Sequence, residues 1–348
     1  MSAVLGVELS RCGLDDTPEI AALLNRVWGA TYGPTGCPLF TADYLRWLYG
    51  GPDAASTALL GVRVDGELRA FKAALSRPAL LDGHSVRAFQ ATHLTLDPTL
   101  PLAPRLGCLQ QLATPHLLVG HDALLPDGPL DLGIAFFEEK KTILQNMRPM
   151  VRKHAIARSV LRFQQAIVDP RTLRPAVARG LAVGLAARPV VEADLPALSA
   201  LHARVTAGSR LALTATVDQL RHRLFGLGRS GAWLVEEHGA PTGFLQAYIL
   251  DTVRGASSVS VAVVELLAYG GSADAAAVLL EEAVQLGRRH GARGVVMENA
   301  TMVAPDAMRA LGLVPSARRM VMALLAREGA LPALDEPELG GAFYVDVK

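Results

Sequence analysis

The stretch TADYLRWLYG at residues 41–50 returns as TVDQLRHRLFG at residues 216–226. Each copy opens with a threonine, carries Asp-x-Leu-Arg and ends in a glycine, and each is followed by two apolar runs around a tight turn. The turns are Asp65-Gly66 in the first copy and His238-Gly239 in the second. A helix–strand–turn–strand unit that recurs after about 175 residues indicates two copies of one domain, because solenoid repeats are only roughly 20–50 residues long.

Length and composition also favour two globular domains. The 348 residues are 51% hydrophobic and 19% charged, which is enough apolar surface for two cores at roughly 150 residues per domain. The net charge of +1 gives no reason to expect nucleic acid as a partner. No apolar run reaches the roughly 18 residues of a membrane span and no signal peptide is evident, so we expect a soluble, cytoplasmic protein without a membrane span.

The cysteines and histidines predict neither disulfides nor a metal site. Cys12, Cys37 and Cys108 are far apart and form no Cys-x-x-Cys pair, a pattern that is typical of a reducing compartment. The scattered histidines lack metal-ligand spacing. We therefore expect no metal cofactor.

Periodicity and turn residues predict the elements of the first half. Asp15-Asp16-Thr17-Pro18 opens one helix and Thr41 caps a second. The Pro-rich stretch 97–104 is predicted to be neither helix nor central strand, so the next helix is expected to begin near Arg105. Strands are expected at 7–10, 57–64, 68–76, 86–96 and 133–137, hairpin turns at Asp65-Gly66 and Asp82-Gly83, and a further helix at about 139–147.

The second half repeats this order and ends in a long helix at about 274–290, a strand at 294–297, a helix at 299–311 and a strand near 319–325. The stretch 166–186 contains Pro170, Pro175, Gly180 and Gly184 and is the predicted linker. We predict an N-terminal domain at 1–165, this linker, a C-terminal domain at 187–326 and a tail at 327–348 that could add a closing strand.

The order strand, helix, helix, three antiparallel strands, helix, strand, helix, strand resembles the GNAT superfamily of acyl-CoA-dependent N-acyltransferases. The runs RRHGARGVVMEN at 288–299 and AMRALGLVP at 307–315 are similar to the ending of that family. The resemblance implies an α/β (α+β) fold with two tandem GNAT-like domains, each a mixed, mostly antiparallel central sheet flanked by helices. It also implies transfer of an acyl group from acetyl-CoA, or a longer acyl-CoA, to an amine.

The family's donor site implies which residues would hold the pantetheine thioester. In that family the pyrophosphate lies on free N–H groups at the start of the third helix, beside an Arg-x-x-Gly-x-Gly/Ala pattern. Here Arg and one Gly of that pattern survive, and an ordinary helix start is the competing interpretation. The implied donor residues are Leu94, Thr95, Leu96, Arg105, Leu106, Gly107, Cys108 and Leu109.

The corresponding turn of the second half, Gly271-Ser272-Ala273-Asp274, carries a carboxylate and no cation. A carboxylate there would repel pyrophosphate and compete for the N–H groups as a helix cap. We therefore expect the second copy to be degenerate and the first to bind the donor.

His93, Asp97 and Glu138 are the candidate catalytic acids and bases. His93 and Asp97 lie on one face of the expected fourth strand by alternation, Glu138 follows the fifth strand, and Glu265 occupies the place of His93 in the second copy. Each could equally be a satisfied structural residue. The family's helix-four tyrosine has no counterpart here. Some tandem members place the chain's carboxyl terminus in the site, which would be Lys348 here.

Trp28, Tyr32 and Tyr49 are the candidate acceptor-binding residues, because the first two helices cover the acceptor pocket in this family; helix–sheet packing is the alternative for Tyr49. Three functions stay open. The first is N-acyl transfer from coenzyme A or an acyl carrier protein to an amine. The second is a non-catalytic tandem module that binds a small molecule or a protein. The third is acylation of a peptide N-terminus in natural-product biosynthesis.

Overall fold

The computed structural model describes residues 6–33, 36–112, 131–138, 156–255, 257–298, 303 and 305–327. We use "first half" for residues 6–138 and "second half" for residues 187–298. The first half contains β1 (Val7–Arg11), η1 (Leu14–Asp16), α1 (Thr17–Tyr32), β2 (Cys37–Pro38), α2 (Ala42–Tyr49), η2 (Ala54–Ser56), β3 (Ala58–Val64), β4 (Glu67–Leu81), β5 (His84–Leu96), α3 (Leu102–Gln111) and β6 (Leu132–Glu138).

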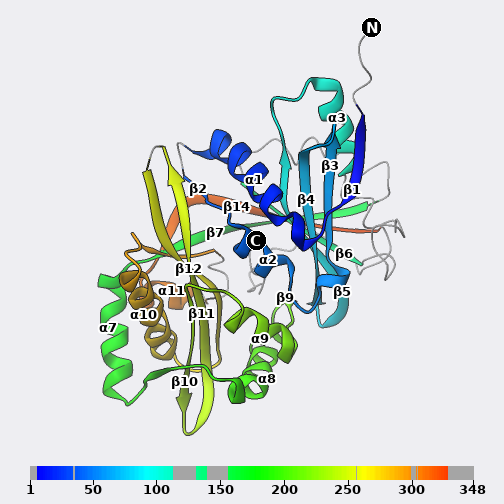
Figure 1. Cartoon of the computed structure of the whole chain (residues 1–348). Helices are drawn as coiled ribbons and strands as arrows, with labels where there is room; N and C mark the ends of the chain where they lie inside the picture. The colour runs from blue at the N-terminus through cyan, green and yellow to red at the C-terminus, as the bar shows by residue number, and fades with distance from the viewer. Residues whose placement is uncertain are drawn as a thin grey trace.

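The second half repeats this order, as the sequence predicts (Figure 1). It contains β8 (Ala187–Pro189), η3 (Glu192–Asp194), α8 (Leu195–Thr206), β9 (Leu211–Leu213), α9 (Val217–Phe225), β10 (Ser230–Glu237), β11 (Ala240–Arg254), β12 (Ser257–Tyr269), α10 (Ala273–Arg289) and β13 (Val295–Met297). The halves are connected by β7 (Ile156–Val168) and α7 (Pro170–Ala182), and the described chain ends with α11 (Pro305–Ala310) and β14 (Leu313–Arg327).

The repeated stretches are two capped helices. The Thr41 hydroxyl accepts a hydrogen bond from the backbone N–H of Tyr44, and Thr216 does the same for Gln219. These bonds satisfy N–H groups that a helix start leaves without a partner. The predicted caps of α2 and α9 are therefore confirmed.

The hairpin turns are also confirmed. Both residues of Asp65-Gly66 have positive φ, at 53° and 84°, and the Asp82-Gly83 and His238-Gly239 turns share this conformation. Positive φ at both central residues matches the right-handed twist of the flanking strands. Asp-Gly pairs fit because glycine adopts this region without steric cost and aspartate tolerates it.

The two predicted central sheets join into one 14-stranded sheet. Its order is β1-β3-β4-β5-β6-β14-β7-β13-β12-β11-β10-β8, and β2 and β9 lie off this path. Within each half the strands are antiparallel except for one parallel pair, β5 with β6 and β12 with β13. The predicted mixed, mostly antiparallel sheets flanked by helices are thus confirmed, and they are continuous.

The continuity comes from an exchange of strands at the centre. β14, at the end of the described chain, pairs with β6 of the first half from Met320–Glu138 to Ala326–Leu132. β7, which follows the first half, pairs with β13 of the second half from Val295–Val168 to Met297–Ala166. β7 and β14 pair with each other between these two contacts (Figure 1). Each half is therefore completed by a strand that crosses the junction.

Two short strands cross the junction in the same reciprocal way. β2, between α1 and α2, pairs with β11 through Thr252–Pro38 and Val253–Cys37. β9, between α8 and α9, pairs with β4 from Ala79–Leu213 to Leu81–Leu211. The halves are thus related by an approximate twofold axis, as in an isologous dimer interface.

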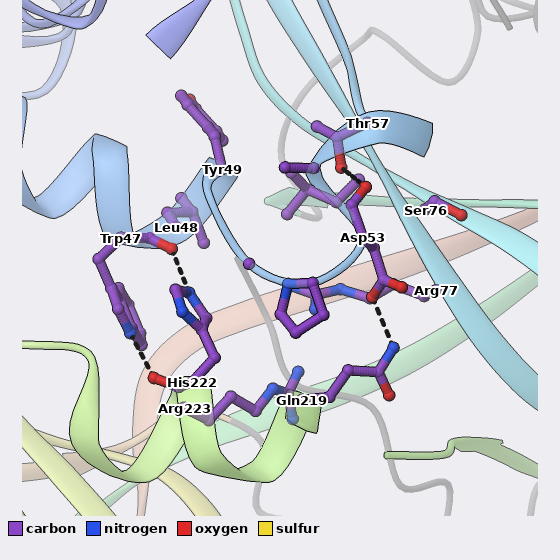
Figure 2. Close-up of a pocket in the computed structure, with 14 residues that line it drawn as sticks. Trp47, Leu48, Tyr49, Asp53, Thr57, Ser76, Arg77, Gln219, His222 and Arg223 are labelled. Carbon is purple, nitrogen blue, oxygen red and sulfur yellow. Dashed lines mark hydrogen bonds between the residues drawn. The ribbon is translucent and has the colours of Figure 1, made fainter. Parts of the chain in front are cut away.

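α2 and α9 meet on this axis through equivalent residues (Figure 2). The Trp47 Nε1 donates to the His222 carbonyl at 3.2 Å, and the His222 Nε2 donates to the Trp47 carbonyl at 2.7 Å. The Trp47 ring lies over Gly226 and the His222 ring over Gly51, so a Cβ at either glycine would come within about 3 Å of the ring. The repeat spacing of 175 residues separates Trp47 from His222, so the two are equivalent residues of the two copies.

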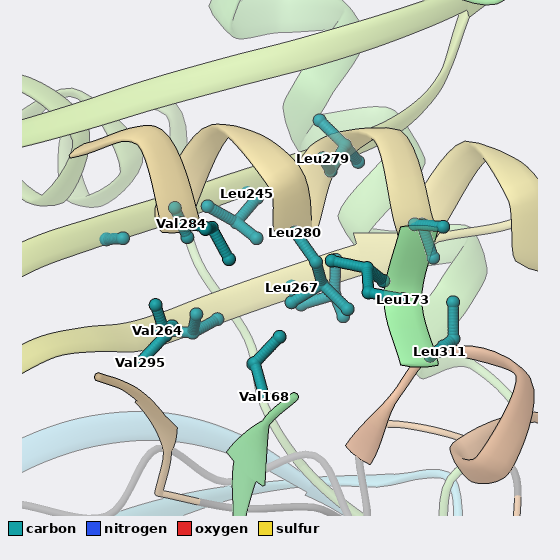
Figure 3. Packing of buried hydrophobic residues seen from close by; sticks show 14 of the residues in the cluster. Val168, Leu173, Leu245, Val264, Leu267, Leu279, Leu280, Val284, Val295 and Leu311 are labelled. Atoms are coloured by element: carbon teal, nitrogen blue, oxygen red, sulfur yellow. The ribbon is translucent and has the colours of Figure 1, made fainter. Parts of the chain in front are cut away.

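Helices cover both faces of the sheet. α1, α2, α8 and α9 lie on one face, which we call the α2 face, where Tyr248 of β11 joins the aromatic cluster of the first half. α3, α7 and α10 lie on the opposite face. Figure 3 shows Leu279, Leu280 and Val284 of α10 packed on β11 and β12 beside Leu173 of α7. Burying each such side chain stabilises the fold by roughly 1.5–3 kcal/mol.

Three local expectations differ from the structure. α3 begins at Leu102, within the stretch predicted to be non-helical, because Pro104 falls in its first turn where a missing N–H costs nothing. The segment predicted as a linker contains helix α7, in which Leu173 and Ala176 are buried in the core of the second half. β7 was not predicted. The domain boundaries themselves stay predictions, and the predicted helix at 139–147 and the tail at 328–348 lie outside the described residues.

None of the described helices is long and apolar enough to cross a membrane.

The strand exchange predicts that both halves unfold together. Met322 of β14 is fully buried beside β6 and β7, so Met322→Ala should lower the free energy of unfolding by roughly 2–5 kcal/mol. Urea unfolding would be followed by the fluorescence of Trp28 and Trp47 in a Trp233→Phe background, and of Trp233 alone in the complementary background. Both reporters should shift to the same lower urea concentration.

The control is Val314→Ala on the same strand, where the side chain is 49% exposed and a cost of under about 1 kcal/mol is expected. Separate transitions for the two reporters, with Met322→Ala moving only one of them, would contradict the prediction.

Candidate functional site

The pairing of the parallel strands of the first half ends where the family's donor site would be. β5 and β6 pair from Ala88–Leu132 to Ala91–Ala135. β5 then continues to Leu96 and β6 to Glu138 without further pairing between them. The backbone pairing between the two strands therefore ends at Ala91–Ala135, and we call the place where the ends of β5 and β6 are no longer paired the opening. In the second half the β12–β13 pairing ends at Val264–Met297, where β13 itself ends, while β12 continues to Tyr269.

A β-bulge lies beside the end of the parallel pairing in each half. The register of β4 with β5 passes from Phe71–Thr95 to Ala73–Thr92, and His93 in between has a φ of 54°. A bulge re-aims side chains and locally disrupts the ladder. In the second half the register jumps at Glu265, from Gln246–Leu266 to Ala247–Val264. The two residues matched from the sequence thus occupy corresponding bulges.

His93 is buried on the α2 face among aromatic rings. Its side chain is 6% exposed, and its Nδ1 lies 2.8 Å from the Tyr49 hydroxyl. The Phe40 ring approaches it edge-on at 5.0 Å and the Trp28 ring lies at 5.8 Å. Burial raises the pKa of Tyr49 well above its ordinary value, so the phenol is neutral and orients the imidazole by a hydrogen bond.

The structure brings two predicted acceptor residues to the same place. The Trp28 Nε1 donates to the Thr95 hydroxyl at 2.8 Å, and Thr95 in turn donates to the His93 carbonyl at 3.0 Å. Tyr32 meets Trp28 edge-on at 5.7 Å. The third, Tyr49, is only 1% exposed, which leaves it under His93 rather than on an open wall.

Asp97 is a structural anchor rather than a proton acceptor. Its side chain is 2% exposed and forms ion pairs with Arg69 at 2.9 Å and Arg26 at 3.1 Å. It also accepts from the Thr99 hydroxyl and backbone N–H. Burial alone would raise its pKa, but the bonds from Thr99 and Arg69 and the charge of Arg26 outweigh it and lower the pKa to about 2. A general base works best when its pKa lies near the pH at which the enzyme operates. A carboxylate with a pKa of about 2 is a weak base at neutral pH, which argues against the predicted role of Asp97.

Asp97 lies on the α2 face together with His93 and Thr95, as alternation predicts, because it pairs with Arg26 of α1 while Thr95 bonds to Trp28 of the same helix. Glu138 ends β6 at the mouth of the opening; its side chain lies outside what the structure describes. Its predicted role stays a prediction.

The predicted phosphate residues lie inside helix α3. The backbone N–H of Arg105 already bonds to the Pro101 carbonyl at 3.1 Å, so the free N–H groups at the helix start are those of Leu102 and Ala103, since Pro101 and Pro104 have none. Cys108 is fully buried beneath the helix, and burial raises the pKa of its thiol. The predicted position of the free backbone N–H groups, at Arg105, is therefore wrong by about one helical turn.

The remaining predicted donor residues differ in exposure, and Leu96 packs beside the apolar cluster beneath α3. Leu94, Leu106 and Leu109 are about half-exposed, whereas Thr95 is buried. Their predicted contact with a pantetheine donor stays a prediction.

The equivalent helix of the second half is closed by its own side chains. The Ser272 hydroxyl accepts from the Ala275 N–H and caps α10, whereas the cap was predicted at Asp274. Asp274 instead forms an ion pair with Arg179 of α7 at 2.8 Å. The Glu237 carboxylate lies against Gly271. These acidic groups disfavour pyrophosphate at this helix.

Sequence reasoning missed the residues that complete the site from a distance. Phe40 is held over His93 by two 2.8 Å bonds between its backbone and the Asn25 side chain, and no local signal marks such a contact. Lys72, opposite the bulge, is 1% exposed, donates to the Leu112 carbonyl at 3.2 Å and has its pKa lowered to about 7 by burial. A lysine within an apolar strand run was the available signal.

Comparison with known proteins places the fold. No family model and no curated protein matches the chain in sequence. Among solved structures, Saccharomyces cerevisiae N-myristoyltransferase with bound myristoyl-CoA matches with a TM-score of 0.64 at 14% identity, over 94% of this chain and 80% of that one. A GCN5-related N-acetyltransferase from Kribbella flavida gives 0.53 at 16% identity, over 92% and 70%.

A probable N-acyltransferase from Enterococcus faecalis, described as a conserved protein of unknown function, gives a TM-score of 0.54 at 11% identity over 93% of this chain and 73% of that one. Similarity at these identities shows the fold. The chain therefore has the tandem GNAT fold expected from its element order, with both GNAT-like units present.

The ion pairs of Asp97 predict a pH-dependent stability. Because the folded pKa of about 2 lies below the ordinary 3.8, the stabilisation is present above pH 3.8 and is lost as the pH falls toward 2; the difference corresponds to roughly 2–3 kcal/mol. Asp97→Asn should lower the free energy of unfolding by about this amount at pH 7. In urea titrations, the difference in the free energy of unfolding between wild type and Asp97→Asn should become smaller as the pH falls from about 5 to about 2.

Asp43→Asn serves as the control, because Asp43 is 91% exposed and its loss should leave stability nearly unchanged at every pH. If the difference in the free energy of unfolding between wild type and Asp97→Asn stays constant across this pH range, the ionised carboxylate of Asp97 does not stabilise the fold.

Proposed function

We propose that the protein is an N-acyltransferase that transfers an acyl group from acyl-CoA to an amine, with the donor bound by the first half. The observation that carries this proposal is the end of the β5–β6 pairing directly beside the bulge at His93. A bound acyl-CoA would supply an activated thioester carbonyl. The similarity in fold to an N-myristoyltransferase that holds myristoyl-CoA supports the same class of donor.

The residues at the opening suit the steps of such a transfer. Backbone N–H groups at the bulge and along the free edge of β5 are donors that can stabilise negative charge on a carbonyl oxygen. His93, oriented through Nδ1 by Tyr49, is the proposed base that removes a proton from the amine. As the amine nitrogen bonds to the thioester carbonyl carbon, the C–S bond breaks, and the thiolate leaves and takes up a proton from the protonated His93 or from water. When Nδ1 carries the proton and donates to the phenol oxygen, the Nε2 lone pair is the acceptor.

The acceptor is proposed to lie along Trp28, whose ring is 5.8 Å from that of His93, and Tyr32, which meets Trp28 edge-on. Both a small-molecule amine and a peptide N-terminus, including one acylated in natural-product biosynthesis, are compatible with an aromatic wall. The second half is proposed to bind no donor, since Ser272, Asp274 and Glu237 surround the start of α10.

His93→Ala should reduce kcat by about 10²–10⁴-fold with acetyl-CoA or myristoyl-CoA, because general base catalysis contributes this much. Product formation would be followed by mass spectrometry with a panel of amines and of peptides with free N-termini. Tyr49→Phe should have a smaller effect, since it removes only the hydrogen bond that orients the ring.

His84→Ala is the matched control, because His84 is exposed at the start of the same strand. If His93→Ala turns over every thioester at the wild-type rate, His93 is not the base. If wild type consumes no thioester with any amine, the alternative of a non-catalytic binding module replaces the proposal.

A pantetheine arm on an acyl carrier protein is the second candidate donor. The two prolines at the start of α3 remove N–H donors that would hold the pyrophosphate of coenzyme A, and a carrier-bound arm needs no such site. The comparison of acetyl-CoA with S-acetylpantetheine tests this. Values of kcat/KM within about threefold of each other would favour the carrier, whereas a preference of about 100-fold for acetyl-CoA, near 2.7 kcal/mol, would favour coenzyme A.

A further inference from the structure

A small polar hollow, with a cavity volume of about 30 Å³ and partly open to solvent, lies where α2 and α9 meet (Figure 2). Its walls come from the loop after α2, from β4 and from α9, so both halves contribute. The residues that line it are Trp47, Leu48, Tyr49, Gly51, Pro52, Asp53, Ala54, Thr57, Leu75, Ser76, Arg77, Gln219, His222 and Arg223.

The charged side chains of this lining are mostly cationic. Arg77 comes from β4 and Arg223 from α9, and Asp53 is the one carboxylate among the lining residues. Asp53 already accepts from the Gln219 amide at 2.6 Å. Arg223 is only 7% exposed, and a guanidinium withdrawn from water in this way is stabilised by anions close to it.

The approximate twofold axis shows that the fold does not require these cations. The spacing of 175 residues relates Arg223 to Leu48 and Gln219 to Tyr44, and the matched hairpins and bulges of β4 and β11 relate Arg77 to Leu250. Leu48 belongs to the apolar cluster of the α2 face, and Tyr44 and Leu250 pack against it. The positions equivalent to Arg223 and Arg77 are therefore both leucine, so the repeated fold accepts an apolar side chain at either place.

We propose that this hollow is a binding site for a small anion that carries a carboxylate or phosphate group. Arginine presents five N–H donors in a planar fork that matches both groups. Arg77 and Arg223 have partners within the chain, and a guanidinium can bind a ligand while it keeps an internal contact. The hydroxyl of Ser76, which also lines the hollow, is a further donor.

The site is distinct from the opening beside His93, although the two are close. Tyr49 lines the hollow and also hydrogen-bonds to His93, so one buried side chain separates them. The anion site does not depend on acyl transfer, and its occupancy is measurable without any thioester.

The test is thermal unfolding of the full chain in increasing inorganic phosphate or acetate, with chloride adjusted to hold the ionic strength constant. A ligand that binds only the folded state raises Tm in a saturable way. Saturation by phosphate alone would assign a phosphate ligand, and saturation by acetate alone a carboxylate. Arg223→Leu and Arg77→Leu, which install the leucines found at the equivalent positions, should each weaken the apparent affinity at least about tenfold.

Arg221→Leu on the same helix is the matched control, because Arg221 pairs with Glu192 at 2.8 Å outside the hollow; it should keep the wild-type affinity. Arg77→Gln and Arg223→Lys retain polarity and provide folded variants if the leucine variants do not fold. The proposal is overturned if neither anion gives a saturable shift, or if folded Arg77 and Arg223 variants respond as wild type does.

Discussion

The hydrogen-bond ladder between β7 and β14 is the constraint on which the rest of the structure depends. Each of these strands follows one half in sequence and completes the sheet of the other. Neither half can bury its own edge without the partner's strand, because an open edge leaves backbone groups without hydrogen bonds. The exchange therefore fixes the relative position of the halves, and with it every contact between α2 and α9.

The two halves share a backbone geometry, but only the first half carries the candidate active site. Both halves have a bulge beside the end of a parallel strand pairing, so the backbone geometry survived in both. The side chains diverged: aromatic rings enclose His93 in the first half, whereas in the second half Ser272 and an acidic residue occupy the helix start. Under the proposed function, one copy would carry the chemistry while the other supplies structure.

The junction diverged as well. On the axis itself Trp47 and His222 make equivalent bonds in both directions. Away from the axis, Leu48 and Leu250 are apolar where Arg223 and Arg77 are charged. Positions that a homodimer would fill twice with the same residue thus carry leucine in one half and arginine in the other, which is possible only because the two halves are encoded separately.

The sequence by itself determined the local elements. Thr41 and Thr216 mark helix starts, Asp-Gly pairs mark hairpins, and the repeat and element order indicate a tandem fold, because capping, positive φ and periodicity are encoded within a few residues. Only the tertiary structure decided the exchange of β7 and β14, the bulge that turns His93 under Phe40, and the ion pairs that hold Asp97. These depend on strand register and on residues far apart in the chain, which local patterns do not specify.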